Sequence, residues 1–502
     1  MNQTPVLIVG AGPSGLALAL ELACYKVPFK IIDKAHGPGE TSRAMLVVPK
    51  VLESYQKFGL DKTVSAWGII PEHAHFHSNN KRVASLPMGI MGKGQSAYPY
   101  LVTLPQDEHE RILIDKLYEF GIKVEWETEL VTLKQLNEKS EATMSHQNEM
   151  ETEAFNYVIG CDGASSQVRK QSEVDFEGET YEQIFYVMDA EVDGEIAEEV
   201  AGSFSFIKDY FALFFPLRNK KTTRVIGMFP PDLTQKKDLS YESLKPRLEK
   251  AFNIEIRKMN WFSDYKIHAR TASHFKIGNH FLVGDAAHIH SPIGGQGMNL
   301  GIGDATNLGW KLAQVINHDA SEKLLDTYEK ERKEIAEFVV STTDRMFSLI
   351  VGNKSGNLLT RQLLIPIFGR LADSVRPFQK RLYTLLAQLY ISYEESPLSQ
   401  GAASRLKAGQ RLPYVDSEPF EFIREYGWQL HAFKPLLDEE LQREFKHHKI
   451  TAVHRKWTDQ ARDKGFEEKQ WLLVRPDGYI GWIGSEDQPD ELLTYVKEWL
   501  MK

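Results

Sequence analysis

The chain has 502 residues, 42% of them hydrophobic and 26% charged, and its formal net charge is −9 at pH 7. Typical domains hold about 100–200 residues, so this length predicts two or three domains around a large core. The acidic balance argues against a nucleic-acid-binding surface, which needs a cluster of basic residues. The only two cysteines, Cys24 and Cys161, exclude a disulfide framework and a cysteine-based zinc site.

Targeting and membrane signals are missing from the sequence. The first residues lead directly into a hydrophobic strand, without the basic segment that begins a secretory signal. No apolar run reaches the roughly 18 residues that a membrane span needs. We therefore expect a cytoplasmic protein without an integral membrane segment, present as a monomer or homodimer.

The N-terminal segment predicts a βαβ unit. An apolar run at 6–9 ends in a glycine, residues 15–24 suit a packed helix, and residues 29–33 form the next strand. Further along, we expect helices at 112–120 and 299–316 and buried strands at 157–160 and 281–283.

The middle of the chain has a different composition. Between about residues 177 and 268, aromatic and β-branched residues cluster in 204–206, 210–217 and 224–229, with turn residues between them. This pattern predicts an antiparallel sheet, inserted as a substrate domain. Residues 358–393 have helical spacing; two prolines interrupt them, which favours interdomain packing over a membrane-surface helix. A strand–turn–strand pattern surrounds Pro476-Asp477-Gly478 near the end.

The first chemical signature is Gly10-Ala11-Gly12-Pro13-Ser14-Gly15, between a strand and a helix. Gly10 permits the tight turn, Gly12 lets backbone amides approach a pyrophosphate, and Gly15 lets the helix pack closely. The helix N-terminus favours phosphate, and Asp33 at the end of the second strand can bind a ribose diol. The motif predicts dinucleotide binding but does not distinguish NAD from FAD.

A second glycine-rich turn favours FAD. Residues 283–288 (Val-Gly-Asp-Ala-Ala-His) follow a strand, and residues 292–299 (Pro-Ile-Gly-Gly-Gln-Gly-Met-Asn) lead into a helix. Asp285 can bind polyol hydroxyls, and the glycine loop can bring amides against the edge of a flavin ring. A third turn, Gly-Cys-Asp-Gly-Ala at 160–164, again follows a strand.

These three motifs in this order, together with Ser42-Arg43-Ala44 and Leu104-Pro105-Gln106, resemble the aromatic-hydroxylase class (class A) of flavoprotein monooxygenases. The best match is the three-domain branch, which is similar to phenol hydroxylases and polyketide or antibiotic hydroxylases. The resemblance covers nearly the whole chain, and residues 474–480 resemble the thioredoxin-like C-terminal domain of that branch. This segment lacks a CxxC motif, so it cannot exchange disulfides.

The resemblance implies an α/β and α+β fold. It would combine a Rossmann-like, p-hydroxybenzoate hydroxylase-like FAD-binding domain at 1–176 and 269–355 with an antiparallel-sheet substrate domain at 177–268. A helical connector at 356–404 would lead to a thioredoxin-like domain at 405–502.

The resemblance also implies roles for matching residues. The motif glycines would hold the FAD pyrophosphate, Asp33 the adenosine ribose, and Asp285 the ribityl region. Asp162 would serve FAD placement and NAD(P)H use, or would bond only the turn amides. The full set of expected cofactor contacts is Gly10, Gly12, Gly15, Asp33, Lys34, Arg43, Gln106, Asp162, Asp285, Gly294, Gly295, Gly297, Met298 and Asn299.

The sequence does not assign a catalytic acid or base. His288 and His290 have the right chemistry, but no nearby partner supports acid–base work, so a structural role is favoured. The candidate pocket residues are Tyr210, Phe215 and Pro292. The phenylalanines at 204, 206, 214 and 215 are possible pocket walls, although neighbouring strand positions point to opposite faces.

The implied activity is hydroxylation of an aromatic, phenolic or polycyclic molecule with NADPH or NADH and O₂. The resemblance implies that NAD(P)H reduces FAD and that reduced FAD captures O₂ as a C4a-hydroperoxide, which then hydroxylates the ring. No second GxGxxG serves NAD(P)H, which agrees with transient binding. A flavin-dependent epoxidase or halogenase is an alternative, although the Trp-x-Trp-x-Ile-Pro element of halogenases is missing. The other alternative is a degenerate flavoprotein that binds a ligand without turnover.

Overall fold

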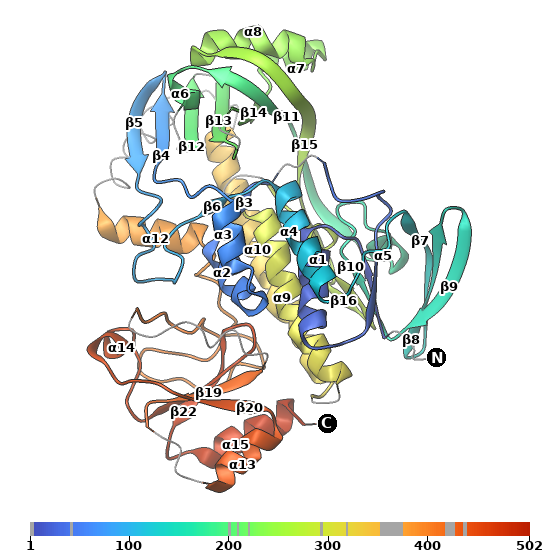
Figure 1. The fold of residues 1–502 in the computed structure, drawn as a ribbon, viewed down its shortest axis with the longest axis vertical. Coiled ribbons are helices and arrows are strands. Elements are labelled where there is room, and N and C mark those ends of the chain that lie inside the picture. The colour runs from blue at the N-terminus through green and yellow to red at the C-terminus, as the bar shows by residue number, and fades with distance from the viewer. Residues whose placement is uncertain are drawn as a thin grey trace.

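The structure is a computed structural model that describes residues 5–40, 44–198, 202–207, 210–218, 221–291, 295–317, 320–351, 375–416, 427–434 and 439–501. Three predicted site residues, Arg43, Pro292 and Gly294, lie outside this set, as do residues 356–374 of the predicted connector. The surroundings of the Tyr210 side chain are also outside the description. Figure 1 shows a broad sheet at the top, a central body of helices and strands, and a C-terminal unit at the bottom.

The central body contains the predicted βαβ unit. Its five-stranded sheet has the order β16-β17-β10-β1-β2, and all pairs are parallel except β16 with β17. The strands are β1 (Val6–Val9), β2 (Phe29–Ile32), β10 (Tyr157–Gly160), β16 (Lys276–Ile277) and β17 (His280–Leu282). These runs are largely buried and rich in branched residues, which is typical of parallel strands covered by helices.

Helices cover this sheet. Helix α1 (Pro13–Cys24) packs against α9 (Gly297–Ile316) and α4 (Gln106–Glu119). The sequence predicted α4 only from residue 112, because its first turn is polar and shows no apolar period. The other helices of the body are α2 (Pro49–Tyr55), η1 (Gln56–Phe58), α3 (Asp61–Trp67), α5 (Gln167–Gln171), η2 (Gly284–Ala286), α10 (Lys323–Val351) and α12 (Arg376–Leu386).

Two small sheets complete the body. One pairs β3 (Leu46–Val47) with β6 (Val102–Thr103), and the other joins β7 (Thr128–Leu136), β8 (Lys139–His146) and β9 (Glu149–Phe155). The three-stranded sheet projects from the right of the body in Figure 1.

The upper sheet is larger than the sequence predicted. It has eight strands in the order β18-β15-β11-β14-β13-β12-β4-β5. The predicted region supplies β11 (Phe176–Asp193), β12 (Gly202–Ile207), β13 (Tyr210–Pro216), β14 (Thr223–Met228) and β15 (Glu255–Ala272). The range 177–268 is nevertheless incomplete, because β4 (Ala74–Ser78), β5 (Lys81–Leu86) and β18 (His288–Ile289) also join the sheet. Nor is the sheet purely antiparallel, since β12 pairs with β4 in parallel.

Helices cover one face of this sheet, as Figure 1 shows at the top. They are α6 (Glu195–Glu198), α7 (Pro231–Lys236) and α8 (Tyr241–Phe252). Leu244, Leu248 and Phe252 of α8 share a buried apolar cluster with Tyr186 and Phe214 of the sheet. We call this covered side the outer face and the side toward the central body the inner face.

The C-terminal unit is a four-stranded sheet with helices. Its order is β20-β19-β21-β22, with β19 and β20 parallel and the other pairs antiparallel. The strands are β19 (Trp428–Ala432), β20 (Ile450–His454), β21 (Gln470–Val474) and β22 (Ile480–Ser485), and the helices are α13 (Glu439–His447), α14 (Asp459–Asp463) and α15 (Pro489–Trp499). The predicted strand–turn–strand around Pro476 is confirmed as β21–β22, with Gly478 at φ +83° in the turn.

Candidate functional site

The glycine turn after β1 is packed tightly on one side and open on another. A Cβ at Gly10 would lie 2.4 Å from the carbonyl oxygen of Cys161, and one at Gly15 would lie 2.0 Å from that of Gly10. A Cβ at Gly12 would meet no described atom within 4 Å. Within the described residues, the N-terminus of α1 has neither a side-chain cap nor an acidic residue in its first turn. The turn therefore offers amides and open space to an anionic group.

Asp33 closes this turn from the end of β2. Its Oδ2 accepts a hydrogen bond of 2.7 Å from the amide of Ala11, and its Oδ1 accepts one of 2.8 Å from Ala35. Each carboxylate oxygen has two acceptor positions, so the partly buried Asp33 keeps capacity for a ribose hydroxyl. Lys34 beside it is exposed.

The second glycine turn lies beside the first. A Cβ at Gly284 would come within 2.5 Å of Ser14 Oγ, so turns separated by about 270 positions are in contact. The next residue, Asp285, is exposed, yet burial by surrounding protein raises its pKa, and the charge of Asp304 raises it further. Asp285 therefore lies at a solvent-accessible position next to the first turn.

The third turn contributes to the shape of the other two. Asp162 Oδ2 accepts hydrogen bonds from the amides of Gln167 (2.6 Å) and Val168 (3.2 Å), so it caps α5. Arg169 then donates to the carbonyl oxygens of Ala164 at 2.7 Å and Ala286 at 2.8 Å. Arg169 thereby joins the third turn to the second, while Asp162 is engaged with turn amides.

Gln106 lies at the start of α4. Its Nε2 donates to Glu110 Oε1 at 2.8 Å, and its backbone amide donates to the carbonyl of Ala44 at 3.0 Å. Burial raises the pKa of Glu110, whose other oxygen accepts from the amide of Gly39 at 3.3 Å. Gln106 thus lies against the segment that leads to the predicted Arg43.

The loop before α9 is fixed by Asn299, which is fully buried. Its Nδ2 donates to the carbonyls of Leu46 (2.7 Å) and Gly295 (2.9 Å), and its Oδ1 accepts from Val48 at 3.0 Å. These bonds commit Asn299 to the backbone, so it shapes the loop. Gly297 and Met298 are partly exposed, and described residues provide no side-chain cap for α9. The α9 amides are therefore available to a ligand.

The two histidines of this region differ. His288 is buried and its Nε2 lies 2.7 Å from Asp304 Oδ2, a partner that the sequence did not reveal. His290 Nδ1 lies 2.7 Å from the carbonyl oxygen of Ser291, and burial lowers the pKa of His290 to about 4. Asp304 is the one acidic residue of α9, and its place in that helix was the available signal.

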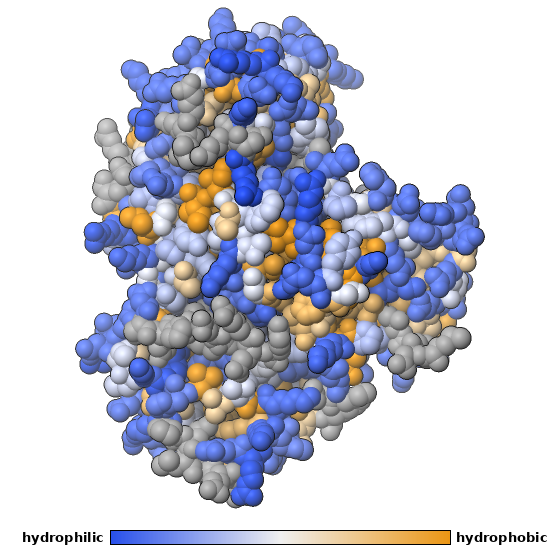
Figure 2. Space-filling view, viewed as in Figure 1, coloured by the Kyte–Doolittle hydropathy of each residue, from blue (hydrophilic) through white to orange (hydrophobic). Residues whose placement is uncertain are grey.

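The inner face of the upper sheet is apolar and partly exposed. Strand register separates the four candidate phenylalanines: Phe204, Phe206 and Phe215 point to the inner face, whereas Phe214 is buried on the outer face against Phe252 at 5.5 Å. The half-buried apolar residues of the inner face are Phe76, Phe204, Phe206, Leu213, Phe215 and Ile226. In Figure 2, one patch of apolar surface lies just below the upper sheet, and others lie over the central body and the C-terminal unit.

One ion pair lies on this apolar face. Arg224 donates to both oxygens of Asp189, from Nε and Nη2, at 2.8 Å each. Arg224 pairs in register with Phe215, which places the ion pair on the inner face. The side chain of Asp189 remains 17% exposed and that of Arg224 only 2%. The sequence prediction named neither residue.

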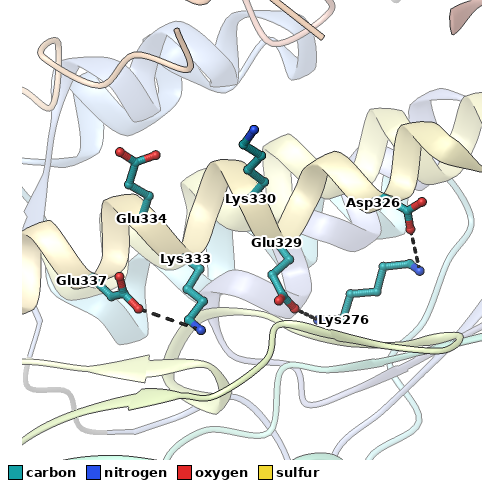
Figure 3. Close-up of a pocket in the computed structure, with 7 residues that line it drawn as sticks. All are labelled: Lys276, Asp326, Glu329, Lys330, Lys333, Glu334 and Glu337. Carbon is teal, nitrogen blue, oxygen red and sulfur yellow. Dashed lines mark hydrogen bonds and ion pairs between the residues drawn. The ribbon is translucent and has the colours of Figure 1, made fainter. Parts of the chain in front are cut away.

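A charged hollow on α10 is not part of this region. Its volume is about 600 Å³, and its lining consists of Lys276, Asp326, Glu329, Lys330, Lys333, Glu334 and Glu337 (Figure 3). These charges pair with one another, as Lys276 does with Asp326 at 2.8 Å. Glu329 also accepts from the amides of Phe275 and Lys276, which ties α10 to the segment before β16. With only charged walls, the hollow does not suit an aromatic molecule.

The described ranges contain neither a candidate metal site nor a candidate membrane span. There, no group of three or more His, Cys, Asp or Glu side chains could hold a metal ion. Over the same ranges, no helix is both long enough and apolar enough to cross a bilayer.

Comparison with known proteins assigns the family. Residues 3–343 match the family described as an FAD binding domain, and residues 432–502 match the C-terminal domain of aromatic-ring hydroxylases. The chain is 33% identical over 350 residues to a flavin-dependent monooxygenase of Mycobacteroides abscessus, covering 67% of this chain and 72% of that protein. It is 27% identical to a pentachlorophenol 4-monooxygenase of Sphingobium chlorophenolicum over 99% of this chain and 97% of the relative. A solved anhydrotetracycline hydroxylase from Streptomyces rimosus has a TM-score of 0.80 and 25% identity, with 99% of both chains covered.

The chain therefore belongs to the FAD-binding aromatic-ring hydroxylases. It is an FAD-dependent monooxygenase that hydroxylates an aromatic substrate, and its family uses NAD(P)H and O₂ as co-substrates. The residues present fit FAD: the three turns contact one another, Gly12 faces open space, and the N-termini of α1 and α9 carry no side-chain cap among the described residues.

Proposed function

We propose that this enzyme hydroxylates a polycyclic phenolic molecule that lies flat against the inner face. The observation that carries the proposal is the breadth of the aromatic surface. Phe76 stacks on Phe204 with ring centroids 4.9 Å apart, and Phe204 contacts Phe215 edge-on at 5.9 Å. These residues come from the three adjacent strands β4, β12 and β13. Because neighbouring strands lie about 4.8 Å apart, the surface spans roughly 10 Å and suits fused rings better than one ring.

The cofactor would lie along the three turns. Amides around Gly12 would bind the pyrophosphate, Asp33 the adenosine ribose, and Asp285 the ribityl hydroxyls. The loop from Gly295 into α9 would bring backbone amides to the flavin ring. When bound, FAD supplies the transfer of electrons from NAD(P)H and the activation of O₂. The protein supplies binding, orientation and a dry surface.

The inner face would exclude water and orient the substrate. Apolar walls limit the water that reaches the reacting atoms, so the activated oxygen is less exposed to unproductive decay. The Asp189–Arg224 pair gives this face a polar position, where a hydroxyl or carbonyl substituent of the substrate would be oriented. A mostly apolar pocket with few polar groups is the usual form of a small-molecule site.

The C-terminal unit would be a thioredoxin-like domain without redox activity. The support is its arrangement: two parallel strands joined through a helix, then an antiparallel hairpin and a final helix. The cysteines of the chain, Cys24 and Cys161, both lie in the central body, so this domain has no thiols. We propose for it a structural role.

The proposal is tested with the purified FAD-loaded enzyme. Oxidation of NADPH and of NADH would be followed with single-ring phenols and with three- or four-ring phenols, and products would be analysed by mass spectrometry. We expect multi-ring phenols to stimulate oxidation most and to gain one oxygen atom. A halogenated or epoxidised product would contradict the proposal, as would tight ligand binding without stimulation. Preference for single-ring phenols would contradict the polycyclic assignment.

A further inference from the structure

A buried polar cluster lies directly behind the second glycine turn. Its centre is Asp304 of α9, which is fully buried. Asp304 Oδ2 accepts a hydrogen bond of 3.0 Å from the amide of Gly284 and one of 2.7 Å from Nε2 of His288, while its Oδ1 accepts one of 2.6 Å from Nε of Arg332. One carboxylate thus fixes the turn, the strand β18 that follows it, and the helix α10.

The protonation states in this cluster follow from its surroundings. Burial alone would raise the pKa of Asp304, but Arg332 and His288 outweigh it and hold that pKa below its ordinary value. His288 Nδ1 is buried and has no hydrogen-bond partner in the part of the chain that the structure describes. The other ring nitrogen, Nε2, lies 2.7 Å from Asp304 Oδ2. Asp304 is then an anion that only accepts hydrogen bonds.

Arg332 extends the cluster to the C-terminal domain. Its Nη1 donates to the hydroxyl of Tyr393 at 2.9 Å, and its Nη2 donates to the carbonyl oxygen of Leu300 at 3.1 Å. The Tyr393 ring lies 4.4 Å from that of Tyr479, in the turn between β21 and β22. The chain of contacts therefore runs from the flavin-side turn through one arginine to the hairpin of the C-terminal domain.

The neighbouring residue of α10 anchors the same hairpin. Glu331 accepts two hydrogen bonds from Arg475, at 2.8 and 2.9 Å, and Arg475 also donates to Asp477. Arg475 lies 4.9 Å from the centre of the Tyr393 ring. Two consecutive residues of α10 thus connect to both sides: Arg332 bonds Asp304, which holds the Gly284 amide, and Glu331 bonds Arg475 of the hairpin.

Stability alone does not account for such a cluster. Buried ion pairs lose much of their attraction to desolvation, and apolar residues of similar volume often stabilise a fold as well. Charged groups that make several directed hydrogen bonds hold their neighbours in a fixed geometry. The geometry held here is that of Gly284, whose neighbour Asp285 is exposed to solvent.

We propose that Asp304 is a positioning residue for the Gly284–Ala287 turn, and that the C-terminal domain supports it through Tyr393 and Arg332. The proposal rests on the placement of FAD at this turn given under Proposed function. A turn that loses the Asp304 carboxylate moves Asp285 away from the cofactor, so FAD binds less tightly and in a changed environment.

The experiment compares four single variants with the wild-type protein. FAD would be removed and titrated back, which gives the dissociation constant and the absorbance spectrum of bound flavin. Asp285→Asn tests the placement of FAD, Asp304→Asn the central carboxylate, and Tyr393→Phe the link to the C-terminal domain. Tyr495→Phe is the matched control, because this tyrosine is also buried but donates to Leu398 and not to the cluster.

We expect Asp285→Asn and Asp304→Asn each to raise the FAD dissociation constant roughly tenfold or more, since a charged partner is lost. Tyr393→Phe should raise it about threefold and shift the flavin spectrum in the same direction as Asp304→Asn. Tyr495→Phe should stay within about twofold with an unchanged spectrum.

Each contrary result has a distinct meaning. If the FAD dissociation constant of Asp304→Asn stays within twofold of the wild-type value while Asp285→Asn binds FAD more weakly, the positioning role of Asp304 is overturned. The placement of FAD at the turn then still holds. If Asp285→Asn also binds normally, the placement of FAD fails and the inference fails with it. If Asp304→Asn does not fold, Tyr393→Phe decides, and equal effects of Tyr393→Phe and Tyr495→Phe overturn the proposal.

Discussion

At the scale of single residues, the first turn separates packing from binding. Gly10 and Gly15 are required by backbone contacts within the fold, as the Cβ positions next to Cys161 and Gly10 show. Gly12 has no such contact, and its φ of −72° is accessible to any residue. The fold therefore gives no reason for glycine at position 12, whereas a pyrophosphate that approaches the turn does.

This difference predicts opposite outcomes for two alanine variants. Gly12→Ala should keep the free energy of unfolding of the FAD-free protein within about 1 kcal/mol of wild type, because its methyl group enters open space. Its FAD dissociation constant should rise about tenfold or more, because the methyl group occupies the position of the phosphates. Gly15→Ala should instead lower the stability of the FAD-free protein by several kcal/mol, as an overpacked site does. Denaturant unfolding measures the stability of each variant, and FAD titration measures its affinity for the cofactor. Normal FAD affinity in Gly12→Ala would contradict the placement of the pyrophosphate at this turn.

At the scale of elements, the two faces of strand β13 have different surroundings. Phe214 packs into the cluster under α8, and Phe215 beside it is half-buried on the inner face. The sequence predicted that neighbouring side chains of the strand point to opposite faces of the sheet. It did not predict which face is buried, because that depends on which helices cover the sheet.

Neighbouring phenylalanine variants test this division. Phe214→Ala should lower the free energy of unfolding by about 3–5 kcal/mol, since it leaves a cavity in a closed core. Phe215→Ala should cost less stability and should weaken binding of the aromatic substrate several-fold, since an aromatic contact is lost. Thermal unfolding and substrate titration of the FAD-loaded enzyme provide the measurements. Weaker substrate binding by Phe214→Ala than by Phe215→Ala would reverse the assignment of the faces.

At the scale of the whole molecule, buried histidines set the response to acid. Burial lowers the pKa of His109, His280 and His290 to about 4, against an ordinary value of 6.5. Between these values the unfolded chain binds more protons than the folded one. Their contribution to stability is therefore fully present above pH 6.5 and is lost as the pH falls toward 4.

For one such histidine, the linkage amounts to about 2 kcal/mol between pH 7 and pH 5. His109 is fully buried against the hydroxyl of Tyr55, at 3.0 Å, so it is the clearest case. We expect the variant His109→Gln to lose about 2 kcal/mol less stability than wild type over this pH range. Chemical unfolding at the two pH values measures the difference. An identical pH dependence in the two proteins would show that His109 is not the titrating group.

Sequence reasoning found the local features of the fold and missed those that depend on distant contacts. The βαβ unit, the glycine turns and most strands of the upper sheet follow from spacing and apolar pattern within short segments. Strands β4 and β5 were missed because they are short and rich in His, Ser, Lys and Arg, and because β4 pairs with β12, far along the chain.

The candidate site shows the same limit. Its glycines and acids lie in motifs with fixed spacing, so they could be named from the sequence. Asp304 and Arg332 lie on two different helices, and the ion pair of Asp189 with Arg224 joins two strands. A polar residue in an apolar segment indicates that a partner exists, but only the fold identifies it.

The pairing of β4 with β12 also bears on how new substrate preferences arise in such enzymes. The half-buried apolar residues of the inner face come from two stretches of chain, residues 74–86 and residues 176–272, between which lie α4, the projecting three-stranded sheet and β10. Recombination that transfers only the longer stretch from one relative to another would combine the edge strands of one parent's sheet with the central strands of the other parent's sheet. The stacked pair of Phe76 and Phe204 would then come from two different parents. With the substrate on the inner face as proposed, a chimaera would inherit the complete surface only when both stretches are transferred together.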